Sequence, residues 1–134
     1  MSQLIHTSIA DTVHPGKRVF AKLDAKVSWM DSSLGETLTV YGNTENLSGN
    51  SVLVGVEVLP PVGEPVSITL YDGKKEIITV SATVIRVERD PAKPKAALSI
   101  GKDIDKWQNK VLPAAQQWVT NDMKTNYEGD DWLN

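Results

Sequence analysis

The stretch Asn46-Leu47-Ser48-Gly49-Asn50-Ser51-Val52-Leu53-Val54 joins a short polar turn directly to a β-branched strand. Valine recurs at every second position from Val52 to Val58. Because side chains in a strand alternate between its two faces, this spacing predicts a strand that buries one face. The turn before it presents asparagine and serine side chains at the rim of a sheet, where they can hydrogen-bond a flat polar ligand.

The same period of two recurs along most of the chain. Because turn residues separate the alternating runs, each run predicts a separate strand. The Asp72-Gly73 pair is typical of a hairpin turn between two of them. The other predicted strands cover residues 19–29, 37–41, 66–70, 78–84 and 95–100.

A helical spacing of apolar residues replaces this pattern at residues 104–119, and Asp103 is suited to cap the start of a helix. Pro113 lies inside the pattern, so we expect the helix to kink or restart there. Several short strands followed by one helix predict a mostly β protein, a small closed or nearly closed β-barrel with a C-terminal capping helix. Trp107 and Trp118 lie on the apolar face of the helix, which we expect to cover an open end of the barrel.

Length and composition exclude several classes of protein. The chain has 134 residues, of which 40% are hydrophobic, and this suffices for one domain with a real core. The formal net charge of -3 disfavours general nucleic-acid binding, and the absence of cysteine excludes disulfides and thiolate metal sites. No apolar run is long enough to span a membrane, and residues 1–10 lack a signal-peptide pattern, so we expect a soluble intracellular protein.

Enzymatic chemistry is hard to assemble from these residues. The two histidines, His6 and His14, lack the nearby carboxylate pattern that would favour a metal site. No serine lies in a nucleophile elbow, and no glycine-rich phosphate loop is present. We therefore expect no catalytic residue, no metal and no cofactor.

A basic segment, Lys17-Arg18-Val19-Phe20-Ala21-Lys22, lies upstream of the polar turn. Alone, it fits a solvated strand face equally well. The turn at Asn46 gives it a complement, because arginine grips phosphate in bidentate fashion and stacks on purines, whereas asparagine and serine bond to base edges. The combination predicts a site for an anionic ligand that carries a base.

Together these segments resemble the PilZ family, whose domains are small six-stranded antiparallel β-barrels that bind cyclic di-GMP. The family signature has two arginines separated by three residues in an N-terminal arm, and a later motif of Asp or Asn, one residue, Ser, two residues and Gly. Asn46 and Ser48 match the later motif, and Ser51 stands where the family has Gly. The segments 59–66 and 82–87 also resemble the family's later strands, so that the resemblance covers residues 14–119.

The arginine motif of the family fits this chain in two registers. One register pairs Arg18 with Lys22, and the other pairs His14 with Arg18. We favour the second, because strand character begins at Val19. Each register retains a single arginine, and neither lysine nor histidine reproduces the planar fork of arginine.

The resemblance implies a non-catalytic receptor for cyclic di-GMP in the cytoplasm of a bacterium. Arg18 would hold the phosphates and stack on guanine, whereas Asn46 and Ser48 would bind a guanine edge. The arm would order against the barrel when the ligand binds and so signal to a protein partner. The implied ligand-binding residues are His14, Lys17, Arg18, Lys22, Asn46, Ser48 and Ser51.

Two alternatives remain at this point. A degenerate PilZ-like adapter would bind a motility, pilus or secretion component without any nucleotide. An unrelated oligonucleotide-binding barrel is disfavoured by the negative net charge and the scarcity of aromatic residues for stacking. We expect no binding of DNA or RNA and no membrane insertion. The predicted single domain comprises an arm (1–17), a β-barrel (18–100), a helix (103–121) and an acidic flexible tail (122–134).

Overall fold

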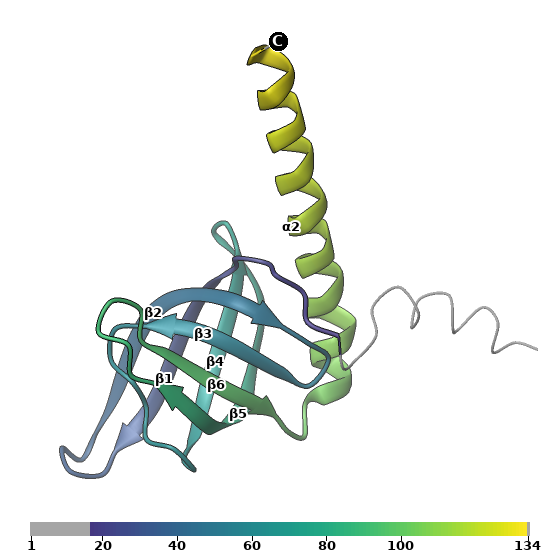
Figure 1. The fold of residues 1–134 in the computed structure, drawn as a ribbon. Coiled ribbons are helices and arrows are strands. Elements are labelled where there is room, and N and C mark those ends of the chain that lie inside the picture. Colours follow the sequence, from purple (N-terminus) through teal and green to yellow (C-terminus); the bar gives the residue numbers. More distant parts are fainter. Residues whose placement is uncertain (1–16, 134) are drawn as a thin grey trace, which may run out of the picture.

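The computed structural model describes residues 17–133, with the side chains of residues 17–124. Six strands are followed by one long helix (Figure 1). The elements in chain order are β1 (Asp24–Asp31), β2 (Glu36–Leu47), β3 (Ser51–Val56), β4 (Pro65–Asp72), β5 (Lys75–Glu88), β6 (Lys95–Ile100) and α2 (Ile104–Leu133).

The six strands form a closed barrel in the order β1-β2-β3-β6-β5-β4, in which β4 also pairs with β1 and every pair is antiparallel. The alternating valines at 52, 54 and 56 all lie in the interior, as their period of two predicts. Closure gives every strand a neighbour on both sides over part of its length. The predicted fold class, a six-stranded antiparallel β-barrel with a C-terminal helix, is confirmed.

The first strand is shorter than the alternating pattern predicts. We expected a strand over residues 19–29, but β1 begins at Asp24, and the described residues before it, 17–23, form an arm that pairs with β2 in an isolated bridge between Val19 and Leu47. The reason lies at Thr44, whose buried hydroxyl accepts from the backbone N–H of Leu23 (2.8 Å) and donates to the carbonyl of Ala21 (2.6 Å). The Thr44 side chain thus occupies backbone groups of the arm that would otherwise bond to the backbone of β2 in a continuous strand ladder.

The polar turn is also shorter than expected. Asn46 lies inside β2, which continues to Leu47, and the turn is confined to residues 48–50. Side chains at the end of a strand are held in fixed directions by the pleat. Asn46 is therefore positioned by the barrel rather than by a loop.

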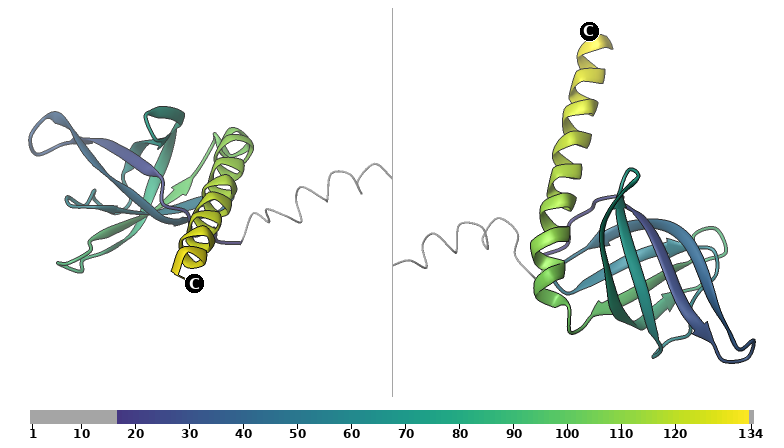
Figure 2. Two further views of the ribbon diagram at one scale, coloured as in Figure 1. Left: turned by 90° about the horizontal axis from the view of Figure 1, so that it is seen from above. Right: turned by 180° about the vertical axis from the view of Figure 1, so that it is seen from behind.

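The helix begins against the barrel, and its C-terminal half projects beyond the strands (Figure 2). Trp107 is completely buried, as predicted, and Trp118 packs partly buried against the core. The helix continues through Pro113 as one element. Proline has no N–H, so the carbonyl of Asn109 loses its helical donor. Both residues face solvent, where water can bond to that carbonyl. The helix runs on to Leu133 and so includes most of the segment 122–134, whose flexibility stays a prediction.

Candidate functional site

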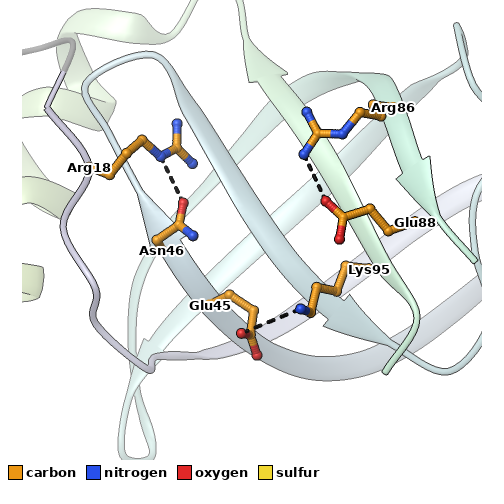
Figure 3. Close-up of polar contacts among 6 residues, drawn as sticks. All are labelled: Arg18, Glu45, Asn46, Arg86, Glu88 and Lys95. Atoms are coloured by element: carbon orange, nitrogen blue, oxygen red, sulfur yellow. Dashed lines mark hydrogen bonds and ion pairs between the residues drawn. The ribbon is translucent and has the colours of Figure 1, made fainter. Parts of the chain in front are cut away.

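Arg18 binds the side chains of the polar stretch that the sequence singles out. Its Nε donates a hydrogen bond to Oδ1 of Asn46 (2.7 Å; Figure 3). Its Nη1 donates to the hydroxyl of Ser48 (3.3 Å) and to that of Ser51. One guanidinium therefore gathers three side chains that lie 28 to 33 residues away in sequence.

The arm holds Arg18 in place through its neighbours. Val19 and Leu47 exchange two backbone hydrogen bonds, of 2.7 and 2.9 Å. Ala21 and Leu23 bury their side chains in the core, which leaves Arg18 and other alternate residues on the outer side. The arm is thus anchored by apolar contacts and backbone bonds, independently of the bonds made by Arg18.

The turn that carries the serines is tied to the helix. Ser48 is buried, and its backbone N–H donates to the carbonyl of Ser51 (2.8 Å). Nε1 of Trp107 donates to the Ser48 carbonyl (2.8 Å), and Nε2 of Gln108 donates to the Gly49 carbonyl (3.0 Å). Because α2 satisfies these carbonyls, the helix fixes the turn against which Arg18 binds.

A second arginine faces the same region of the barrel surface. Arg86 pairs across the sheet with Ala97, Ala97 with Leu53, and Leu53 with Asn46, so these four residues form one row across β5, β6, β3 and β2. Neighbouring strands lie about 4.8 Å apart, so the row spans roughly 14 Å. Arg18 and Arg86 both line a hollow of about 370 Å³ above this row, which we call the Arg18 hollow.

Two register shifts create the row. One lies between Thr44 and Asn46, and the other between Val84 and Arg86. At each shift two successive residues avoid the core: Thr44 and Val84 are buried, and the two residues after each of them are not. A β-bulge redirects side chains in this way. The two bulges place Asn46 and Arg86 on the outer face at matching heights.

The electrostatics of the hollow favour an anion. Partial burial lowers the pKa of the Arg18 guanidinium from its usual value, and the nearby charge of Arg86 lowers it further. Arg86 also pairs with Glu88, whose Oε2 lies 2.8 Å from Nη2, but both side chains are exposed and such a pair contributes only about 0 to 1 kcal/mol. A phosphate in the hollow would relieve the repulsion between the two arginines and accept hydrogen bonds from both.

No protein-family model and no curated protein matches the sequence. The fold does match solved structures. The inhibitor of motility MotI/DgrA of Bacillus subtilis superposes with a TM-score of 0.58 at 19% identity, over 78% of this chain and 50% of that one. The PilZ domain of YcgR from Escherichia coli, solved with c-di-GMP, superposes with a TM-score of 0.59 at 12% identity, over 81% of this chain and 95% of that one.

A third structure, the PilZ domain of CeSA from a cellulose-synthesizing bacterium, gives a TM-score of 0.55 at 20% identity, over 76% of this chain and 97% of that one. The barrel has the PilZ fold. The chain thus spans nearly all of two isolated PilZ domains but only half the length of MotI/DgrA.

Within this PilZ fold, the predicted site residues divide into groups. Asn46, Ser48 and Ser51 gather around Arg18, as described above. Lys17 is exposed and does not line the Arg18 hollow. Lys22 lines a different hollow on the barrel, and His14 lies outside the described residues.

Sequence reasoning missed Arg86. It lies in one of the stretches that resemble the PilZ family, but nothing in its local pattern says which strand residue faces Arg18. That relation depends on the two bulges, because a shift of one residue reverses the face to which a side chain points.

Within the described residues, no three histidine, aspartate or glutamate side chains are grouped so that they could hold a metal ion. The single helix α2, over the residues searched, does not combine the length and the apolar character that crossing a membrane requires.

Proposed function

We propose that this chain is a non-catalytic receptor for cyclic di-GMP and that the Arg18 hollow is its binding site. The observation that carries the proposal is the meeting of Arg18 with Asn46, Ser48 and Ser51 at one end of a row that ends at Arg86. The fold supports it, because the PilZ domain of E. coli YcgR with the same fold was solved with c-di-GMP. The location that goes with this role is the bacterial cytoplasm.

The ligand is proposed to lie along the row. A row of roughly 14 Å suits a molecule with two bases and two phosphates better than a single phosphate. Arg18 would exchange its bonds to the serine hydroxyls for bonds to phosphate, which are stronger because both partners are charged. Arg86 would exchange its exposed ion pair with Glu88 for a contact with the end of the ligand that lies away from Arg18. Asn46 would then bind a guanine edge.

A second candidate function is a nucleotide-free adapter for a protein partner. The observation that favours it is that Arg18 already binds three side chains of its own barrel, one of them the hydroxyl of Ser51, where the PilZ motif has glycine. A ligand must compete with these bonds. If the competition fails, the ordered arm and the barrel surface remain available to a protein.

Isothermal titration calorimetry with cyclic di-GMP separates the two candidates. We expect wild type to bind, and we expect Arg18→Ala to weaken binding by about 1.5 to 3 kcal/mol, the range for a hydrogen bond to a charged group. Arg89→Ala is the matched control, because Arg89 is exposed and lines neither hollow. Heat of binding that is unchanged in Arg18→Ala, or lost equally in Arg89→Ala, would contradict the proposed site.

Three further variants test the two registers of the arginine motif and the hydrogen bond between Arg18 and the Ser51 hydroxyl. Lys22→Arg should leave the affinity unchanged, because Lys22 lines the other hollow, whereas His14→Arg should tighten binding if His14 fills the first arginine position. Ser51→Gly should also tighten binding, since it removes a bond that competes with the ligand. If neither wild type, His14→Arg nor Ser51→Gly gives heat or chemical-shift changes with excess ligand, the receptor proposal fails and the adapter takes its place.

A further inference from the structure

A second hollow lies on the outer face of the barrel, beyond the bulge in β2. It has a volume of about 410 Å³ and is walled by the arm, β2, β3 and the chain that leads into β6. It shares no lining residue with the Arg18 hollow, although Glu45 lines one and its neighbour Asn46 lines the other. We call it the lysine hollow, after Lys22, Lys93 and Lys95 in its walls.

The charges in the lysine hollow are incompletely paired. Nζ of Lys95 lies 3.8 Å from Oε1 of Glu45 (Figure 3). No described residue forms an ion pair with Lys22 or Lys93. Glu57 is the other acidic residue of the lining. Two ammonium groups from separate segments therefore face the hollow without a partner of opposite charge among the described residues.

The wall that carries Lys93 is held in place. The backbone N–H of Val56 donates to the carbonyl of Pro94 (3.2 Å), which attaches this segment to β3. Lys22 sits on the arm, which Thr44 fastens through the backbone of its neighbours Ala21 and Leu23. The backbones that present the two lysines are therefore both fixed to the barrel.

The floor of the lysine hollow lacks a side chain at Gly55, which lies between the buried Val54 and Val56 and so faces outward. A side chain at Gly42 would instead face the barrel interior, because Gly42 pairs with the buried Ala25 and Val56. Gly42 is required by the fold, because a Cβ there would lie 1.8 Å from the carbonyl oxygen of Gly55. Gly55 is not required in this way: its Cβ would meet the carbonyl oxygens of Asn43 and Pro94 at 3.7 and 3.9 Å, which is ordinary contact. Glycine inside a strand weakens it and often marks a place where a ligand approaches the backbone.

An aromatic ring stands beside this floor. Tyr41 is 69% exposed and lines the same hollow. A tyrosine ring next to bare backbone offers a flat apolar surface to a planar group. The floor and the ring thus suit a base, whereas the lysines suit an anion.

We propose that the lysine hollow binds a phosphorylated planar molecule of mononucleotide size. The phosphate lies between Lys22 and Lys93, which serve as point charges for it. The ring lies on the backbone of Gly55 beside Tyr41. The volume falls in the range of small-molecule sites. This site is separate from the proposed cyclic di-GMP site and does not depend on it.

The test is a titration of the ¹⁵N-labelled protein with adenosine monophosphate, followed by amide chemical shifts. The amides of Gly42 and Gly55 should shift and saturate. Adenosine, which lacks the phosphate, and inorganic phosphate, which lacks the ring, should each bind at least tenfold more weakly. An absence of saturable shifts at both glycines with adenosine monophosphate in the millimolar range would overturn the proposal.

Two variants test which residues of the lysine hollow bind the phosphate of the ligand and which bind its ring. The double variant K22Q/K93Q should weaken adenosine monophosphate at least tenfold, whereas K74Q/K75Q, which changes two exposed lysines of the β4–β5 hairpin, should not. Gly55→Ala should weaken adenosine monophosphate but leave inorganic phosphate unchanged, because the new methyl group raises the floor under the ring.

Arg18→Ala separates this site from the first one. It should leave the shifts at Gly42 and Gly55 unchanged. Loss of the shifts in Arg18→Ala would place the nucleotide in the Arg18 hollow and overturn the proposal. Equal weakening in K22Q/K93Q and K74Q/K75Q would show general attraction to positive charge and overturn it too.

Discussion

Replacement of Trp107 tests how the helix closes the barrel and supports the site. The side chain is completely buried and donates from Nε1 to the Ser48 carbonyl at 2.8 Å. Trp107→Ala removes a large ring from the core, which costs about 3 to 5 kcal/mol. Loss of the donor to the buried Ser48 carbonyl adds about 1 to 3 kcal/mol. Trp107→Phe keeps most of the apolar contact but leaves the buried Ser48 carbonyl without its donor, at about 1 to 3 kcal/mol.

The free energy of unfolding is to be measured by urea denaturation, monitored by circular dichroism at a wavelength that reports on strands. With a slope of about 1 to 3 kcal/mol per M, Trp107→Ala should lower the midpoint by more than about 1 M. Met123→Ala is the control on the same helix, because Met123 is 54% exposed, and it should change stability by less than about 0.5 kcal/mol. A wild-type midpoint for Trp107→Ala would refute the capping role of the helix. A Trp107→Phe variant as stable as wild type would refute the role of the bond to Ser48.

Three other perturbations test parts of the fold that position the site. Thr44→Val should destabilise by about 1 to 3 kcal/mol for each of the two arm groups that lose their partner, and an unchanged urea midpoint would contradict this. The pKa of Asp31 lies below its usual value, first because the Ser33 hydroxyl donates to it, so its contribution to the β1–β2 turn is present at neutral pH and lost as the pH falls through that lowered pKa. A carboxyl ¹³C titration of Asp31 that gave a usual or raised value would contradict this. Gly42→Ala should prevent normal folding, whereas Gly55→Ala should cost no more than about 1 kcal/mol; similar urea midpoints for the two variants would show that the contact at Gly42 is not limiting.

The strands and the helix were predictable because their patterns are local. A strand that buries one face must alternate, as Val52, Val54 and Val56 do, and a helix that buries one face must repeat at 3.6 residues, as Trp107 and Val111 do. The cluster around Arg18 was also predictable in part, because the chemistry of the basic segment and of the turn at Asn46 complement each other. The length of β1 was not predictable, because a threonine side chain from another strand replaces part of its ladder.

The sequence by itself determined the barrel, the buried face of the helix and the residue types of the Arg18 site, since each follows from side chains close together in the chain or from their chemistry. Only the tertiary structure decided which basic residues share a hollow. Arg18 and Lys22 are four residues apart in an extended arm, a distance of about 13 Å, so they face different hollows. Arg86 is 68 positions from Arg18 and reaches the same hollow, because two bulges and the closure of the barrel bring β5 into line with β2.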